Sequence, residues 1–87
     1  MTLTFYGPFQ KMAEREVIVD LPESVSLRRL IHILAGKYPA LHPYAAYDTD
    51  EALGAHVVFL ANGGVLKLSD PVGNNDQVNV LLPIMGG

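Results

Sequence analysis

Alternating apolar and polar residues at the start of the sequence predict two strands. Leu3 and Phe5 alternate with threonine and tyrosine residues, and Gly7-Pro8 closes this first run. In the second run, residues 16–21, every other residue is apolar on one face, and the run stops at Pro22. Because the two runs are close together in the sequence, we expect them to pair as a hairpin.

A helix is predicted next, because apolar residues recur at the spacing of a single helical face. These residues are Leu27, Leu30, Ile31 and Leu34. Ser24 or Ser26 is suited to cap the amino end of the helix, and Gly36 and Pro39 mark its carboxyl end. The segment 39–55 that follows shows no sustained period, so we interpret it as an irregular connector with room for a short helical turn.

The rest of the chain has the pattern of strands and turns. A dense run of strand-forming residues covers 56–61, Asn62-Gly63 is a strong hairpin signal, and residues 65–68 supply a return strand. Asp70-Pro71 predicts a turn, and residues 77–82 alternate as a last strand.

The predicted order of elements, ββαβββ, indicates an α+β fold in which one helix lies across one face of a mixed sheet. The strand residues expected to meet the helix are Val17, Val19, Leu21, Val78, Val80 and Leu82. The other face of the sheet is also partly apolar, at Val58, Leu60 and Leu81. We therefore predict a docking surface there for a larger partner protein, unless the connector 39–55 covers it.

Composition narrows the classes of function. Eighty-seven residues, 49% apolar and 17% charged, make one small domain with its own core. The absence of cysteine excludes disulfides, thiol nucleophiles and cysteine-bound metals. A net charge of −3 without a basic cluster argues against nucleic acid, and no apolar run approaches the ~18 residues of a membrane helix. With no secretory signal pattern at Met1 to Tyr6, we expect a cytoplasmic protein.

The residues that could carry chemistry do not form a catalytic or metal-binding pattern. His32, His42 and His56 are scattered along the sequence, whereas a zinc site needs three or four convergent ligands. The acidic group at 48–51 begins like a calcium loop but has Leu53 where that loop needs glycine. We therefore predict no catalytic residue and no metal site.

The sequence ends in Gly86-Gly87. Glycine adds no packing in an exposed tail, but two glycines can thread a narrow channel and deliver a carboxylate to the active site of another protein.

Together, three segments resemble the MoaD/ThiS family of β-grasp, ubiquitin-like sulfur carriers, which includes the small subunit of molybdopterin synthase and the carrier of thiazole synthesis. The segments are Asn62-Gly63, Asp76-Gln77-Val78, and the closing run Leu82-Pro83-Ile84-Met85-Gly86-Gly87. Leu82 stands where the family pattern usually has the first of two prolines, and Gln77 where it usually has an acidic residue.

The resemblance implies a β-grasp domain at residues 1–82 and a flexible tail at 83–87. By analogy with the family, a ubiquitin-activating-type enzyme uses ATP to adenylate the Gly87 carboxylate, which a sulfur donor then converts to a thiocarboxylate. Gly86 would permit close approach to that enzyme, and Pro83, Ile84 and Met85 would line the entry of its channel. The chain itself would bind no cofactor.

The resemblance also suggests the use of the sulfur. The long connector 39–55 is more similar to the molybdopterin type than to the thiazole type, which favours sulfur transfer to a dithiolene precursor of the molybdenum or tungsten cofactor, with a larger synthase subunit as partner. Sulfur donation to thiazole synthesis, a ubiquitin-like modifier joined to lysines through Gly87, and a simple binding module remain alternatives.

Overall fold

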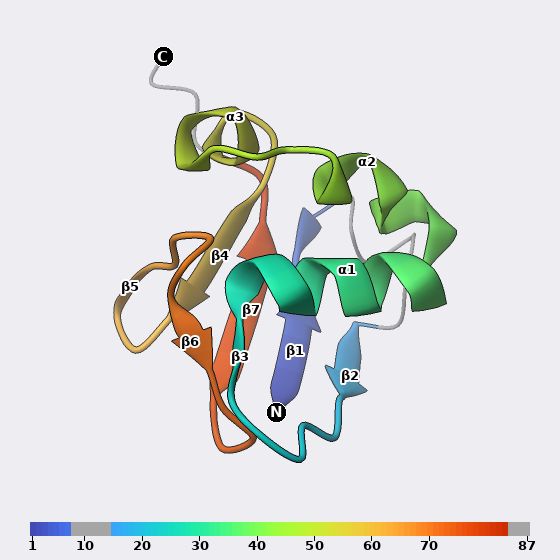
Figure 1. Ribbon diagram of the computed structural model, residues 1–87, viewed down its shortest axis with the longest axis vertical. Helices are drawn as coiled ribbons and strands as arrows, with labels where there is room; N and C mark the ends of the chain where they lie inside the picture. Colours follow the sequence, from blue (N-terminus) through green and yellow to red (C-terminus); the bar gives the residue numbers. More distant parts are fainter. Residues whose placement is uncertain (8–14, 84–87) are drawn as a thin grey trace.

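Five strands form one mixed sheet in the computed structural model, which describes residues 1–7 and 15–83 (Figure 1). They are β1 (Thr2–Phe5), β2 (Glu16–Ile18), β4 (Val58–Ala61), β5 (Gly64–Val65) and β7 (Gln77–Leu81). Their order across the sheet is β2-β1-β7-β4-β5. The central pair, β1 and β7, is parallel, and the other pairs are antiparallel. The predicted α+β class, with a mixed sheet and an amino-terminal hairpin, is confirmed.

The main helix, α1 (Leu27–Lys37), begins where the sequence predicts. The Ser26 hydroxyl accepts a hydrogen bond from the Arg29 N–H at 3.1 Å and so acts as the N-cap. Two further amide groups of the first turn, those of Leu27 and Arg28, donate to carbonyl oxygens of Asp70 and Leu68. The start of α1 is therefore fixed by one side chain and by the backbone of residues 68–70.

Replacing Ser26 with alanine should lower the free energy of unfolding by about 1 kcal/mol, because the Arg29 N–H loses its acceptor. Ser24 is the matched control, since it is exposed and its side chain makes no hydrogen bond to the described residues. Urea unfolding of both variants measures the difference. Equal stability of Ser24→Ala and Ser26→Ala would contradict the assignment of the cap.

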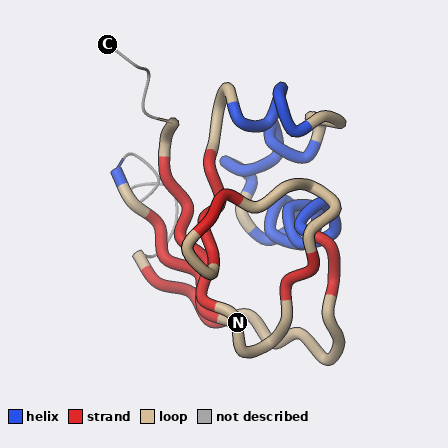
Figure 2. The backbone as a smooth tube through the Cα atoms, turned by 90° about the vertical axis from the view of Figure 1, so that its left-hand side faces the viewer, coloured by secondary structure: helices blue, strands red, loops and turns tan. Residues whose placement is uncertain are grey.

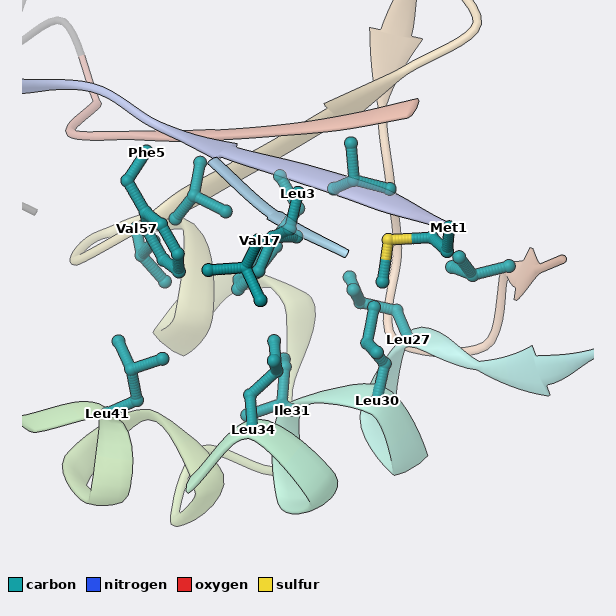
Figure 3. Packing of buried hydrophobic residues seen from close by; sticks show 14 of the residues in the cluster. Met1, Leu3, Phe5, Val17, Leu27, Leu30, Ile31, Leu34, Leu41 and Val57 are labelled. Atoms are coloured by element: carbon teal, nitrogen blue, oxygen red, sulfur yellow. The ribbon is translucent and has the colours of Figure 1, made fainter. Parts of the chain in front are cut away.

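The core lies between the sheet and α1. The helices lie together on one side of the five-stranded sheet (Figure 2). Leu3, Phe5 and Val17 point from the sheet toward Leu30 and Leu34 of the helix (Figure 3), and all five are buried. Val78 and Val80 are buried as well, which confirms the predicted parity of the last strand.

The prediction that Leu82 meets the helix was wrong. The last ladder pair joins Leu81 to Val58, so Leu82 lies one residue past the end of β7 and is 45% exposed.

The expected return strand at 65–68 is shorter than predicted, because β5 ends at Val65. The Asp70 carboxylate accepts from the Lys67 N–H at 2.8 Å and the Asp70 N–H donates to the Lys67 carbonyl, which turns the chain away from the ladder.

The predicted strand at 16–21 ends early, at Ile18. Beyond Ile18, the Val19 N–H still donates to the Met1 carbonyl. The Leu21 N–H donates to the Asn74 side-chain oxygen instead of to a carbonyl of a neighbouring strand. Val19 is only partly buried as a result.

A second, two-stranded sheet was not predicted. Its strands, β3 (Val25–Ser26) and β6 (Pro71–Val72), pair antiparallel beside the start of α1. The expected turn at Asp70-Pro71 is therefore a turn at Asp70 followed directly by a short strand.

The connector 39–55 has more helical structure than the irregular segment with one short helical turn that the sequence predicts. It contains a 3-10 helix, η2 (Pro39–Leu41), and the short helices α2 (His42–Ala45) and α3 (Asp50–Gly54). Arg28 holds it to α1 by donating to the Asp48 carboxylate at 3.1 Å and to the Asp48 carbonyl at 3.0 Å. Four-residue and five-residue helices are too short to show a helical period in the sequence.

Candidate functional site

The predicted functional tail begins where β7 leaves the sheet. β7 ends at Leu81, beside the first residue of β4, and Pro83, the last described residue, is partly exposed. Ile84, Met85, Gly86 and Gly87 lie outside the described residues, so the roles assigned to them stay predictions. The described part of the site is the surface around the end of β7.

The sheet face turned away from α1 carries the predicted docking residues. Val58 and Leu81 lie directly opposite each other in the ladder, and Leu60 follows Val58 on the same face. All three are partly exposed. The described helices of the connector lie on the other side of the sheet (Figure 2). Docking through this face has not been tested and stays a prediction.

Two further apolar side chains extend this surface. Tyr6 is 41% exposed, and its N–H donates to the Val80 carbonyl, which places it beside the end of β7. Val65, opposite Leu60 in the β4 and β5 hairpin, is 63% exposed. We call Tyr6, Val58, Leu60, Val65 and Leu81 the apolar band.

Sequence patterns missed Tyr6 and Val65 because neither the register of β1 against β7 nor that of β5 against β4 can be read from one strand. The Asn62-Gly63 turn was the one available signal, since it fixes Val65 opposite Leu60. Asn62 has φ 54° and Gly63 φ 80°, the conformation that a two-residue hairpin turn requires.

Along β1 and β7, the same face is polar but uncharged farther from the tail. Thr2 and Thr4 of β1 lie beside Gln77 and Asn79 of β7 in register. No Lys, Arg, Asp or Glu belongs to β1, β4, β5 or β7, all of which lie in the described part of the chain. The nearest charged strand residue is Glu16 on β2, opposite Thr4. Docking on this face would therefore not require the desolvation of charges on these four strands.

The histidines do not converge. His32, His42 and His56 are all exposed, and within residues 1–7 and 15–83 no group of three or more His, Asp or Glu side chains could hold a metal ion. His56 stacks on Tyr47, with ring centroids 4.7 Å apart and an angle of 5° between the rings. Burial, with a smaller contribution from Tyr47, raises the pKa of the neighbouring Tyr44 hydroxyl above its usual value of 10, so Tyr44 is neutral at physiological pH. The stacked pair links the connector 39–55 to His56, just before β4.

None of the helices in the described ranges is long and apolar enough to cross a membrane.

Comparisons with known proteins agree on the fold. A family model described as the ThiS family matches residues 3–87, whereas no curated protein matches the sequence. Among solved structures the chain is similar to SAMP1 from Haloferax volcanii, with 24% identity, a TM-score of 0.74 and coverage of 99% of this chain and 97% of that chain. A second structure of that protein, named as H. volcanii small archaeal modifier protein 1, gives 23% identity, a TM-score of 0.74 and 95% coverage of each chain.

A putative molybdopterin converting factor, subunit 1, from Pyrococcus furiosus is similar as well, with 20% identity, a TM-score of 0.78 and 95% coverage of each chain. At these identities the structural likeness shows the fold alone. The predicted β-grasp fold is confirmed.

Proposed function

The chain belongs to the ThiS family, and from this membership we propose that it is a sulfur carrier whose Gly87 carboxylate is adenylated and then converted to a thiocarboxylate. The structural observation that supports the proposal is the apolar band, which ends beside the residue where β7 passes into the tail. A partner seated on the band would receive the tail next to its own surface. The protein supplies recognition and reach, and the partner supplies the catalytic groups.

The chemistry needs an activating enzyme because a carboxylate is a poor electrophile. In the proposed first step, an oxygen of the Gly87 carboxylate attacks the α-phosphorus of ATP, and pyrophosphate leaves. A hydrosulfide ion released by the sulfur donor then attacks the acyl carbon, AMP leaves, and the resulting thiocarboxylic acid loses its proton. The product is a nucleophilic sulfur at the end of the tail, ready for transfer.

For the acceptor we propose a dithiolene precursor of the molybdenum or tungsten cofactor, reached through a larger synthase subunit. Two features support this choice: the long connector 39–55, and the likeness to the Pyrococcus furiosus protein, which is named as a putative molybdopterin converting factor subunit. The family model, in turn, keeps sulfur donation to thiazole synthesis as an alternative.

A protein modifier is the second candidate function. It is favoured by the likeness to SAMP1, which is named as a small archaeal modifier protein. In this case Gly87 would form an isopeptide bond with a lysine of another protein.

Co-expression with the activating enzyme and with each candidate acceptor separates these functions. A carrier gives a thiocarboxylated chain whose sulfur is lost to the acceptor, whereas a modifier gives branched peptides in which Gly87 is joined to lysine. Abundant lysine conjugates without detectable thiocarboxylate would overturn the carrier proposal in favour of the modifier.

A further inference from the structure

An open hollow of about 520 Å³ lies on the outer sheet face, at the end of β7 farther from the tail. It is lined by Leu60, Ala61, Asn62, Gly63, Asn75, Gln77 and Asn79. None of these side chains is charged, and four of the seven residues carry an amide side chain. The hollow adjoins the apolar band at Leu60, which lies opposite Asn79 in the ladder.

Three of these amides form a row. Gln77 and Asn79 alternate with the buried Val78 and Val80, so they share the outer face of β7, and Asn75 lines the same hollow from the turn before the strand. We call Asn75, Gln77 and Asn79 the amide row. Leu81 continues the alternation, so the row leads directly to the apolar band and the tail.

The hydrogen-bonding groups of the row are unused within the described residues. No hydrogen bond to the side chain of Asn75, Gln77 or Asn79 is present there, in contrast to Asn74, whose side-chain oxygen accepts from the Leu21 N–H at 2.9 Å and from the Met1 amino group at 3.2 Å. Each amide of the row therefore offers two donor hydrogens and an acceptor oxygen to an external group.

The backbone beneath the row is held firmly. Gln77 and Asn79 lie in the central strand β7, which pairs with strands on both sides. The turn that carries Asn75 is closed by the Asp76 carboxylate, which accepts from the Gly73 N–H at 2.7 Å, and by the Asp76 N–H, which donates to the Gly73 carbonyl. The side chains of the row thus start from fixed positions, which lowers the entropy lost when they bind.

The spacing of Gln77 and Asn79 within β7 indicates what the row binds, with Asn75 placed beside them by the turn before the strand. Alternate residues of a strand are about 6.8 Å apart, and the carbonyl groups on one side of any extended peptide repeat at the same distance. A planar amide can donate to a carbonyl and accept from an N–H of such a peptide. We infer that the amide row binds the main chain of an extended, uncharged segment of the activating enzyme. This inference rests on the proposed function for the identity of the partner.

Binding to the main chain fits the surroundings of the row. The hollow holds no charged group that could pair with a carboxylate or ammonium group of the partner, whereas an uncharged segment has no charge to desolvate. A segment that runs along β7 from Asn75 reaches Leu81 and then the tail. The apolar band would supply the binding area, and the amide row would set the register of the partner.

A peptide titration tests the row without any enzyme. The probe is an N-acetylated, C-amidated pentapeptide of alternating serine and valine, added at millimolar concentration to the isotopically labelled protein. We expect the side-chain NH₂ resonances of Asn75, Gln77 and Asn79 to shift more than those of Asn74. Unchanged NH₂ resonances of the row at millimolar peptide would overturn the inference.

A loading assay tests the row in its proposed setting. Gln77→Leu and Asn79→Leu remove the hydrogen-bonding groups and keep a branched side chain, so each should raise the KM of the activating enzyme for the carrier about five- to tenfold with kcat unchanged. Glu16→Leu is the matched control, because it adds the same side chain to the same sheet face outside the row. We expect its KM to stay at the wild-type value.

The outcomes separate this inference from the proposed function. Wild-type KM values for Gln77→Leu and Asn79→Leu, with normal loading of Gly87, would overturn the inference and leave the carrier function in place. Absence of loading in the wild-type protein would overturn the carrier function. In that case the peptide titration still decides whether the row binds extended main chain.

Discussion

Replacing Gly86 with valine is expected to abolish thiocarboxylate formation at Gly87 and to leave the melting temperature unchanged. Valine adds a β-branched side chain where the proposed channel has no room, and it restricts the backbone that must extend into that channel. Folding should not respond, because the last strand ends at Leu81, before the tail. The measurements are intact mass after co-expression with the activating enzyme, and thermal unfolding of the same sample.

Two companion variants sharpen this result. Deleting Gly87 should also prevent loading, because it withdraws the carboxylate by up to about 3.6 Å from the adenylation site. Gly36→Ala is the control glycine substitution, since Gly36 is exposed in α1 and a Cβ there meets nothing within 4 Å. Gly36→Ala should load normally. Normal sulfur loading of Gly86→Val would falsify the carrier mechanism.

Introducing a charge into the apolar band is expected to have the second largest effect. Leu81→Asp places a carboxylate within the apolar band on which the partner would dock, where it would be desolvated without a partner charge. We expect kcat/KM for loading to fall by at least about thirtyfold, the equivalent of about 2 kcal/mol. Leu81 is partly exposed, so the variant should still fold.

Ile18→Asp provides the comparison for that result. Ile18 lies on edge strand β2 and is 76% exposed. Ile18→Asp therefore introduces the same charge at an exposed apolar residue away from the apolar band. Steady-state loading assays of the two variants measure the difference. Equal kcat/KM values for Leu81→Asp and Ile18→Asp would place the docking surface elsewhere.

The elements with strong local signals were predictable from the sequence. The spacing of Leu27, Leu30, Ile31 and Leu34 predicted α1, and Ser26 does cap it. Asn62-Gly63 predicted the turn of a hairpin because few other residue pairs adopt positive φ at both positions. The parity of Val78 and Val80 predicted which face of the last strand meets the helix.

The elements that depend on distant residues were not predictable. The pairing of β3 with β6 joins segments far apart in the sequence, and each strand has only two residues, too few to show alternation. The exposure of Leu82 depends on where its neighbouring strands end, which no local pattern records.

Only some residues of the candidate site were predictable from the sequence. Val58, Leu60 and Leu81 could be assigned to the uncovered face from parity alone, because neighbouring residues of one strand point to opposite faces. Tyr6, Val65 and the amide row required the register of the sheet. The terminal glycines carried the functional hypothesis through family resemblance.

Fragmentation mass spectrometry of the wild-type protein, co-expressed with its activating enzyme, tests the carrier function most directly. The carrier function predicts a fraction of the protein whose mass corresponds to exchange of one oxygen for sulfur, with the sulfur located at Gly87. It also predicts that the same sample treated with the sulfur acceptor returns to the unmodified mass. A chain that stays unmodified with an active activating enzyme and sulfur donor present would contradict it.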